Sequence, residues 1–143
     1  TNEGGERVAK VRADLQATMD INAQVYRTEA SLKQALAYIE LLKARFASVS
    51  VQDKGRRFNT DLLEAVELGF LLDLAEVLVV SALQRAESRG GHFREDYPNR
   101  DDVNFMRHTM AYLEPGSADS GPSIRLEFKP VTMTRYRPME RKY

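Results

Sequence analysis

The sequence predicts a mainly α-helical chain: an antiparallel three-helix bundle, similar in outline to a spectrin repeat, then a short β-hairpin and an extended C-terminal tail. Apolar residues recur at helical spacing in three successive segments, and the character of the chain changes after Pro98. Its 143 residues suit one domain with a real core. We expect residues 1–98 to form the bundle with a polar loop, and residues 99–143 to pack on the same domain.

The first two helices follow from the spacing of their apolar residues. Over about residues 6–26 the apolar positions are Val8, Val11, Leu15, Met19 and Val25. Thr28 is a good N-cap for a second helix that ends near residue 47. Its apolar positions are Leu32, Leu36, Ile39, Leu42 and Phe46. The polar connection 48–57 that follows contains a glycine, so the two helices and the next one are expected to run antiparallel.

The third helix is expected to begin at Asn59 or Thr60, both good caps, and to extend toward Gly90 and Gly91, which suit a helix C-terminus. Its apolar residues cover more than one side: Leu62, Leu63, Val66, Leu71, Leu72, Leu74, Val77, Leu78, Val80 and Leu83. We therefore expect it to be buried by the first two helices and by something else. Acidic residues interrupt the apolar run, which disfavours a membrane span: Glu64, Glu67, Asp73 and Glu76.

After Pro98, residues 99–108 can form one helical turn, and residues 108–114 and 124–130 are predicted strands. A loop rich in Gly, Pro and Ser, residues 115–123, joins them. From Arg125 onward the chain has six basic residues and two acidic ones, so the tail is basic.

Composition excludes several classes of function. Lys plus Arg and Asp plus Glu both total 21, so no overall field attracts nucleic acid or an anionic membrane. Because the chain has no cysteine, it contains no disulfide, thiolate nucleophile or cysteine-ligated metal centre. The first residues have neither an apolar signal core nor an arginine-rich leader, so no targeting segment is expected.

Residues 87–102, here called the polar knot, are the densest polar stretch of the chain. Between Arg85 and His108 lie five arginines, five carboxylates and both histidines, so the charges balance. A metal site would use His92 and His108 with carboxylates, but the histidines are far apart in sequence and the arginines repel a cation. The carboxylates available to such a site are Glu95, Asp96, Asp101 and Asp102.

Two other interpretations of the polar knot stay open. His92 beside Glu95 and Asp96 could act as a general base, but such neighbours often occur by chance. The favoured interpretation is structural, with arginines forking onto carboxylates or backbone carbonyls. The arginines are Arg89, Arg94 and Arg100, and the carboxylates are Glu87, Asp96 and Asp101. Phe93, Tyr97 and Pro98 are expected to fix the conformation of the same loop.

The polar knot also carries a resemblance. The run ESRGGHFREDYPNRDD resembles a motif in the C-terminal helical domain of the flavoprotein subunit of the succinate dehydrogenase and fumarate reductase family. The stretches MDINAQVYRTEASLKQAL and IRLEFKPVTMTRYRPMERKY are similar to the first helices and the closing hairpin and tail of that domain, so the likeness covers nearly the whole chain. The chain departs from the usual pattern at Phe70, Gly91 and Phe105.

The resemblance implies a non-catalytic domain. This chain has no Gly-rich G-x-G-x-x-G turn, so FAD is expected in the parent protein and not here. The family's flavin-linked histidine, substrate-binding residues and proton-shuttling arginine lie upstream, so no catalytic, cofactor-binding or metal residue is carried over. The positions that match the motif are assigned a structural or interface role: Glu87, Arg89, His92, Arg94, Asp96, Tyr97, Arg100 and Asp101.

The resemblance also implies a function for the parent. Such an enzyme oxidises succinate to fumarate and passes electrons to an iron–sulfur subunit, then to quinone through membrane anchors. The expected partners are the flavin-binding domain and the iron–sulfur subunit, with the anchors contacted only indirectly and no nucleic acid. The complex is expected on the cytoplasmic side of a membrane, with this chain itself soluble, inactive and prone to self-association. The alternatives are the same domain of a fumarate reductase or L-aspartate oxidase, and a free-standing helical adaptor.

Overall fold

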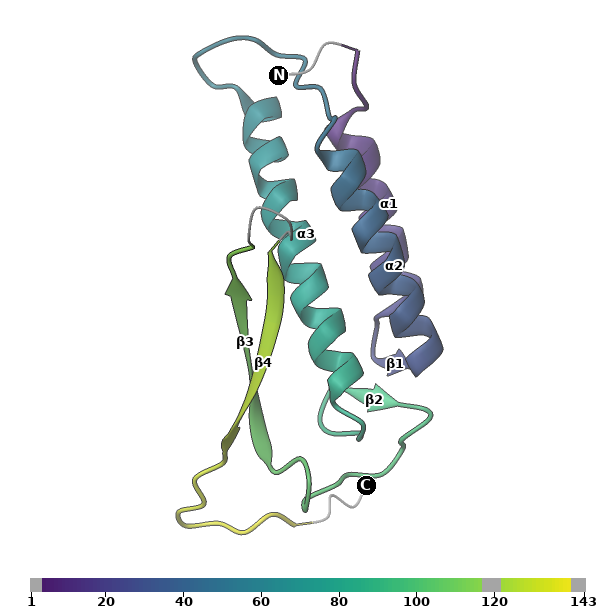
Figure 1. Ribbon diagram of the computed structural model, residues 1–143, viewed down its shortest axis with the longest axis vertical. Coiled ribbons are helices and arrows are strands. Elements are labelled where there is room, and N and C mark those ends of the chain that lie inside the picture. The colour runs from purple at the N-terminus through teal and green to yellow at the C-terminus, as the bar shows by residue number, and fades with distance from the viewer. Residues whose placement is uncertain (1–3, 117–121, 140–143) are drawn as a thin grey trace. The chain divides into compact units, whose positions relative to one another are not determined.

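The computed structural model describes residues 4–116 and 122–139 and divides the chain into two compact units, residues 1–100 and 101–143. The first unit contains α1 (Val8–Asn22), β1 (Tyr26–Arg27), α2 (Glu29–Phe46), α3 (Thr60–Gln84) and β2 (Phe93–Arg94). The second contains β3 (Arg107–Glu114) and β4 (Ser123–Pro130). The three helices alternate in direction (Figure 1), so the predicted helical bundle followed by a hairpin is confirmed. That the two units form one domain stays a prediction.

The predicted caps start the second and third helices. Thr28 accepts a hydrogen bond from the Ser31 amide at 3.0 Å, and the Ser31 hydroxyl accepts one from the Thr28 amide at 3.0 Å. At α3 the Asn59 side chain accepts a hydrogen bond from the Leu62 amide at 2.7 Å. Each cap satisfies amides that the first helical turn leaves without a partner.

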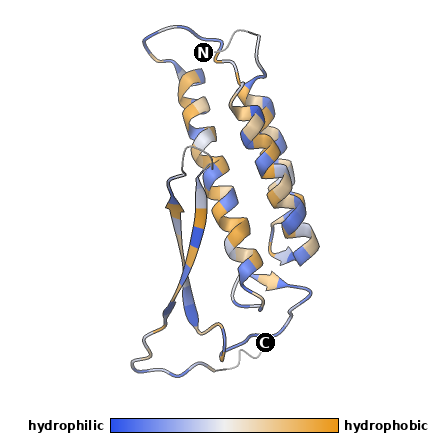
Figure 2. Cartoon of the chain, in the orientation of Figure 1, coloured by the Kyte–Doolittle hydropathy of each residue, from blue (hydrophilic) through white to orange (hydrophobic). Residues whose placement is uncertain are grey.

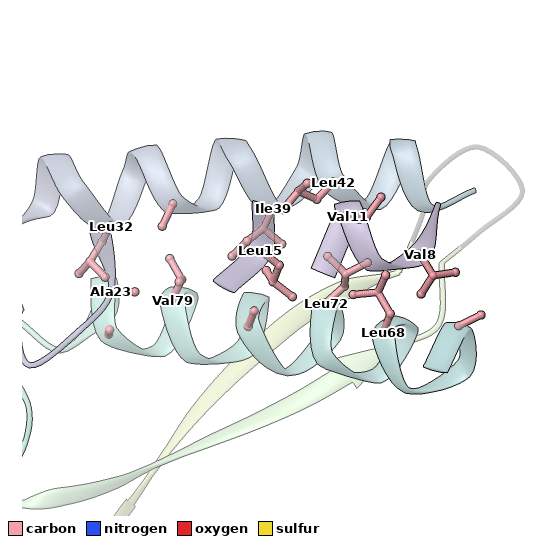
Figure 3. Packing of buried hydrophobic residues seen from close by; sticks show 14 of the residues in the cluster. Val8, Val11, Leu15, Ala23, Leu32, Ile39, Leu42, Leu68, Leu72 and Val79 are labelled. Carbon is pink, nitrogen blue, oxygen red and sulfur yellow. The ribbon is translucent and has the colours of Figure 1, made fainter. Parts of the chain in front are cut away.

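The core is a seam in which each helix contributes buried residues at spacings of three and four (Figure 3). Its helical members are Val8, Val11 and Leu15 of α1, Leu32, Ala35, Ile39 and Leu42 of α2, and Ala65, Leu68, Leu72, Ala75, Val79 and Ala82 of α3. On α3, half of the residues in this seam are alanines. Small residues let neighbouring helices approach closely, and several larger apolar residues of α3 lie outside the seam.

The outward side of α3 is apolar as well, and Figure 2 shows hydrophobic colour along much of the helix. Of the apolar residues that the sequence suggested, Leu72 is buried in the seam. Val77, Val80 and Leu83 are half-buried. The remaining ones are 41–64% exposed: Leu62, Leu63, Val66, Leu71, Leu74 and Leu78. The first two helices therefore cover only one side of α3, as the pattern predicted.

α3 ends earlier than predicted. Its last residue is Gln84, and Arg85 is already extended, with φ −92° and ψ 90°. The glycines do not cap the helix: Gly90, at φ +60°, lies in a tight turn in which the Arg89 amide donates to the His92 carbonyl at 2.8 Å. The prediction of an end near Gly90 was wrong because side chains of the polar knot bind the last carbonyls of the helix instead.

α1 also ends earlier than predicted, at Asn22 instead of near Tyr26. Tyr26 and Arg27 form β1, which pairs in parallel with Phe93 and Arg94 of β2. The Phe93 amide donates to the Val25 carbonyl at 3.1 Å. This long-range pairing overrides the helical pattern of the segment and leaves Val25 50% exposed.

The second unit is an antiparallel hairpin in which Arg107 pairs with Pro130 and Glu114 with Ser123. Both predicted strands are confirmed, and each is longer by one residue. The Arg107 guanidinium lies 3.7 Å from the centre of the Phe128 ring. Of the predicted loop and tail, residues 117–121 and 140–143 lie outside the described residues.

Candidate functional site

Arg94 is the centre of the polar knot. Its side chain is only 1% exposed, although it carries a permanent charge. Nε and Nη2 donate to the two carboxylate oxygens of Asp96 at 2.7 and 2.8 Å. Nη1 donates to the carbonyls of Ala82 and Leu83 at 3.1 and 3.3 Å. The guanidinium thus caps the C-terminus of α3, where the helix dipole favours a positive charge.

Asp96 connects this cap to another helix. Its Oδ2 accepts a hydrogen bond from the backbone amide of Glu29 at 2.9 Å, in the first turn of α2. A carboxylate is favoured at that helix end, where the dipole is positive. The hydrogen bonds from Arg94 lower the pKa of Asp96 to about 2, and the Glu29 amide acts in the same direction. The ion pair therefore joins the C-terminus of α3 to the N-terminus of α2.

Glu87 is a second buried charge, with a side chain that is 0% exposed. It accepts hydrogen bonds from Nε and Nη2 of Arg89 at 2.9 and 3.0 Å, and another from Nη1 of Arg85. A buried carboxylate is tolerated only with such compensation. The expected ion pairs between the arginines and carboxylates of the polar knot are present for Arg89 with Glu87 and for Arg94 with Asp96, each with two hydrogen bonds.

Ser88 holds the backbone of the loop, a role that the sequence reasoning missed. Its hydroxyl accepts a hydrogen bond from the Arg94 amide at 2.9 Å and donates to the Tyr97 carbonyl at 2.8 Å. Its own amide donates to the Asn99 carbonyl at 3.1 Å. Tyr97 packs against the knot with its ring 5.0 Å from the Arg94 guanidinium carbon. The only signal for Ser88 was its place inside the motif.

His92 uses both ring nitrogens within the first unit. Nδ1 lies 2.9 Å from Nη1 of Arg27, and Nε2 lies 3.0 Å from the Arg85 carbonyl oxygen. The ring therefore has no free nitrogen for a metal or for proton abstraction in this arrangement. The other histidine, His108, belongs to β3 in the second unit.

The last residues of the motif lie at the boundary between the units, with Arg100 in the first and Asp101 in the second. The Asp101 carboxylate accepts hydrogen bonds from the amides of Val103 and Asn104 at 3.0 and 2.9 Å. The Phe105 amide donates to the Asp101 carbonyl at 3.0 Å, which completes the predicted single turn. A pairing of Arg100 with Asp101 stays a prediction.

Neither of two other kinds of site is found in the described part of the chain. Over residues 4–116 and 122–139, no three His, Asp or Glu side chains gather as metal ligands would. No helix in these ranges is long and apolar enough to cross a membrane.

In the polar knot the buried charges are thus paired with other charged side chains, and Arg94 and Asp96 also bind helix ends. The fold is a three-helix bundle followed by a hairpin. Comparison with known proteins places it more narrowly. The family described as fumarate reductase flavoprotein C-term matches residues 12–143.

Individual proteins agree with this match. The fumarate reductase flavoprotein subunit of Mycobacterium tuberculosis is 45% identical over 141 residues, which cover 99% of this chain and 23% of that protein. The succinate dehydrogenase flavoprotein subunit of Rickettsia conorii is 41% identical over 131 residues, 92% of this chain and 21% of that protein. The solved quinol fumarate reductase of E. coli superposes with a TM-score of 0.87 at 38% identity, covering 98% of this chain and 23% of that one.

The chain belongs to the succinate dehydrogenase and fumarate reductase flavoprotein family, as the C-terminal domain of the flavoprotein subunit. It spans less than a quarter of the length of these relatives, 21–23%.

Proposed function

We propose that this chain is the structural and interface-forming C-terminal domain of a succinate dehydrogenase flavoprotein subunit, and that it takes no part in catalysis by itself. In this proposal the parent binds FAD in its upstream part, oxidises succinate to fumarate and passes electrons to an iron–sulfur subunit and then to quinone. The observation that carries the proposal is the similarity over nearly the whole chain to the C-terminal part of flavoprotein subunits.

The chemistry common to the relatives is the interconversion of succinate and fumarate. The relatives include both fumarate reductase and succinate dehydrogenase flavoprotein subunits, at 45% and 41% identity. We propose succinate oxidation as the working direction and fumarate reduction as the alternative. Steady-state rates of the complete complex in both directions, with matched electron donors and acceptors, test this choice.

The proposed main partner is the flavin-binding domain of the same subunit. The outer side of α3 offers it an apolar stripe with exposed fractions of 47–64% at Leu63, Val66, Phe70 and Leu74. Phe58 is 99% exposed and has a φ of 52°, a left-handed conformation that is uncommon for a bulky residue. Exposed apolar and aromatic side chains of this kind are typical of a surface that is covered in an assembly.

The remaining proposed partners follow from the parent complex. We propose that the domain helps to shape the surface facing the iron–sulfur subunit and reaches the membrane anchors only through other subunits. The complex would then lie on the cytoplasmic side of a membrane. The E. coli relative is described as a quinol fumarate reductase, which supports a quinone as the terminal partner.

An interaction experiment tests the role of the α3 surface. The chain and the upstream part of the parent subunit are expressed separately and mixed, and the affinity is measured by calorimetry. Leu74→Asp is expected to weaken binding about tenfold or more, because it puts a charge into the apolar contact. Glu40→Gln, on an exposed position of α2, is the control and should bind like the wild type. Equal affinity for both variants would exclude the α3 surface as the contact.

Flavin binding tests the other half of the proposal. Titrating the chain with FAD should give neither a shift of the visible absorption nor quenching of flavin fluorescence. Saturable, stoichiometric binding would contradict the assignment of the flavin site to the upstream part. Without the upstream part, the exposed α3 surface is expected to make the chain self-associate or bind a hydrophobic dye.

A further inference from the structure

The contacts of His92 determine which of its nitrogens carries the proton. Arg27 faces Nδ1 at 2.9 Å, and an arginine side chain can only donate hydrogen bonds, so Nδ1 must accept. Nε2 faces the Arg85 carbonyl oxygen at 3.0 Å, and a carbonyl can only accept, so Nε2 must carry the hydrogen. The arrangement requires a neutral ring in its Nε2–H form.

Three segments meet at this ring, and the one that carries Arg27 is distant in sequence from the other two. Arg27 belongs to β1, Arg85 follows the last residue of α3, and His92 precedes β2. The ladder between β1 and β2 joins only two residues of each strand. Its neighbouring hydrogen bonds include that from the Glu95 amide to the Arg27 carbonyl at 2.8 Å. Because the ladder is so short, the His92 contacts to Arg27 and Arg85 add to what holds β1 against the end of α3.

The charges around the ring disfavour its protonated form. Guanidinium groups face it from each neighbouring element: Arg27 from β1, Arg85 from the end of α3 and Arg94 from β2. The nearby carboxylates bind arginines and not the ring: Glu87 accepts from Arg85 and Arg89, and Asp96 accepts from Arg94. A second ring proton on Nδ1 would point at the Arg27 donor, and the contact between them would be lost.

We propose that His92 is a pH-operated latch that holds β1 against the end of α3 when its ring is neutral and releases Arg27 when the ring is protonated. Neither the family nor the proposed function of the parent is needed for this inference. In mildly acidic conditions the latch opens, and the β1–β2 contact and the turn before α2 become looser. The fastening between Arg94 and Asp96 titrates at much lower pH and stays closed.

The direction of the pH effect follows from linkage. Burial, and then the charges of Arg27, Arg94 and Arg85, lower the pKa of His92 below its ordinary value of 6.5, against the opposing effect of the hydrogen bond to the Arg85 carbonyl. Below pH 6.5 the unfolded chain therefore binds a proton that the folded chain resists. The stabilisation is complete above pH 6.5 and is lost as the pH falls from there toward the lower pKa of the folded state.

The melting temperature of the 143-residue chain between pH 5 and 8 tests the latch. For the wild type the melting temperature should fall measurably on acidification, because the folded ring resists the proton that the unfolded chain binds. His92→Gln can accept from Arg27 and donate to Arg85 without titrating, so most of this fall should disappear. His108→Gln removes the only other histidine of the chain and should keep the wild-type fall.

Nitrogen-15 NMR of the wild-type rings gives a test that needs no variant. The expected result is an Nε2–H tautomer for His92 at neutral pH and a titration midpoint below the ordinary value of 6.5. The protection of the Phe93 and Glu95 amides, taken as the observed exchange rate relative to the intrinsic rate at each pH, should fall as the His92 ring is protonated. An Nδ1–H tautomer, a midpoint at or above the ordinary value, or a His92→Gln variant with an unchanged pH dependence would each overturn the proposal.

Discussion

Replacing Asp96 with alanine should destabilise the bundle strongly, because it leaves the guanidinium of Arg94 buried without its partner. Arg94 is 1% exposed and would lose the acceptors of Nε and Nη2, which lie at 2.7 and 2.8 Å. The Glu29 amide in the first turn of α2 would lose its acceptor at 2.9 Å as well. Only the bonds to the last carbonyls of α3 would remain.

The size of the loss can be bounded from these contacts. Removing one partner of a fully buried ion pair costs about 3–5 kcal/mol, and a lost hydrogen bond to a charged group about 1.5–3 kcal/mol. The Asp96 side chain is 29% exposed, so water can enter and solvate part of the freed guanidinium. We therefore expect a loss of about 3 kcal/mol in the free energy of unfolding. For a unit of this size that lowers the melting temperature by roughly 10–20 °C.

Thermal unfolding followed by circular dichroism measures this loss. The matched control is Glu95→Ala, which removes an exposed carboxylate from the neighbouring position and should change stability by less than about 0.5 kcal/mol. The double variant Arg94→Met with Asp96→Ala should lose less than the sum of the two single variants, because the partners are coupled. An unchanged melting temperature for Asp96→Ala, or a loss equal to that of Glu95→Ala, would refute the reasoning.

Three further predictions concern the rest of the bundle. Thr28→Ala removes the N-cap of α2 and should lower the free energy of unfolding by about 1 kcal/mol in urea titrations. Leu72→Ala opens a cavity at a position that is 1% exposed and should lower the free energy of unfolding by about 2–5 kcal/mol. The control Leu71→Ala, at a position that is 41% exposed, should lower it by less than half as much. The pKa of Asp96 falls from 3.8 to about 2 on folding, so this carboxylate contributes stability that is present above pH 3.8 and is lost as the pH falls through about 2. Asp96→Asn should therefore weaken the dependence of the free energy of unfolding on pH in this acid range.

Local patterns were sufficient to predict the three helices and the two strands of the hairpin, although not every helix end. The Thr28 cap is determined by side chains within three residues of one another, and the hairpin strands by alternation and by the turn residues between them. The pairing of Arg94 with Asp96 and of Arg89 with Glu87 was also predictable, because each pair is two residues apart and the charges balance. Such short-range chemistry can be recognised without knowing the fold.

Long-range contacts explain what the sequence did not reveal. The end of α3 is set by Arg94 binding the Ala82 carbonyl from a different part of the chain, and no local signal indicates it. The β1 strand exists only because Tyr26 lies opposite Phe93. On α3, the core seam uses alanines such as Ala75, while larger residues such as Leu74 face outward. The pattern predicted apolar residues on several sides of α3, but it could not tell which of them the first two helices cover.

The central claim, that the polar knot is structural and the chemistry lies upstream, is tested most directly by turnover in the complete parent complex. Succinate oxidation is measured per bound flavin for wild type, Asp96→Ala and Glu95→Ala, together with the melting temperature of each complex. The account predicts that Asp96→Ala lowers the melting temperature and the yield of assembled complex, while kcat and KM per flavin stay within about twofold of the wild type. A complex with normal melting temperature and flavin content, but with turnover reduced about a hundredfold or more, would contradict it by placing Asp96 in the catalytic machinery.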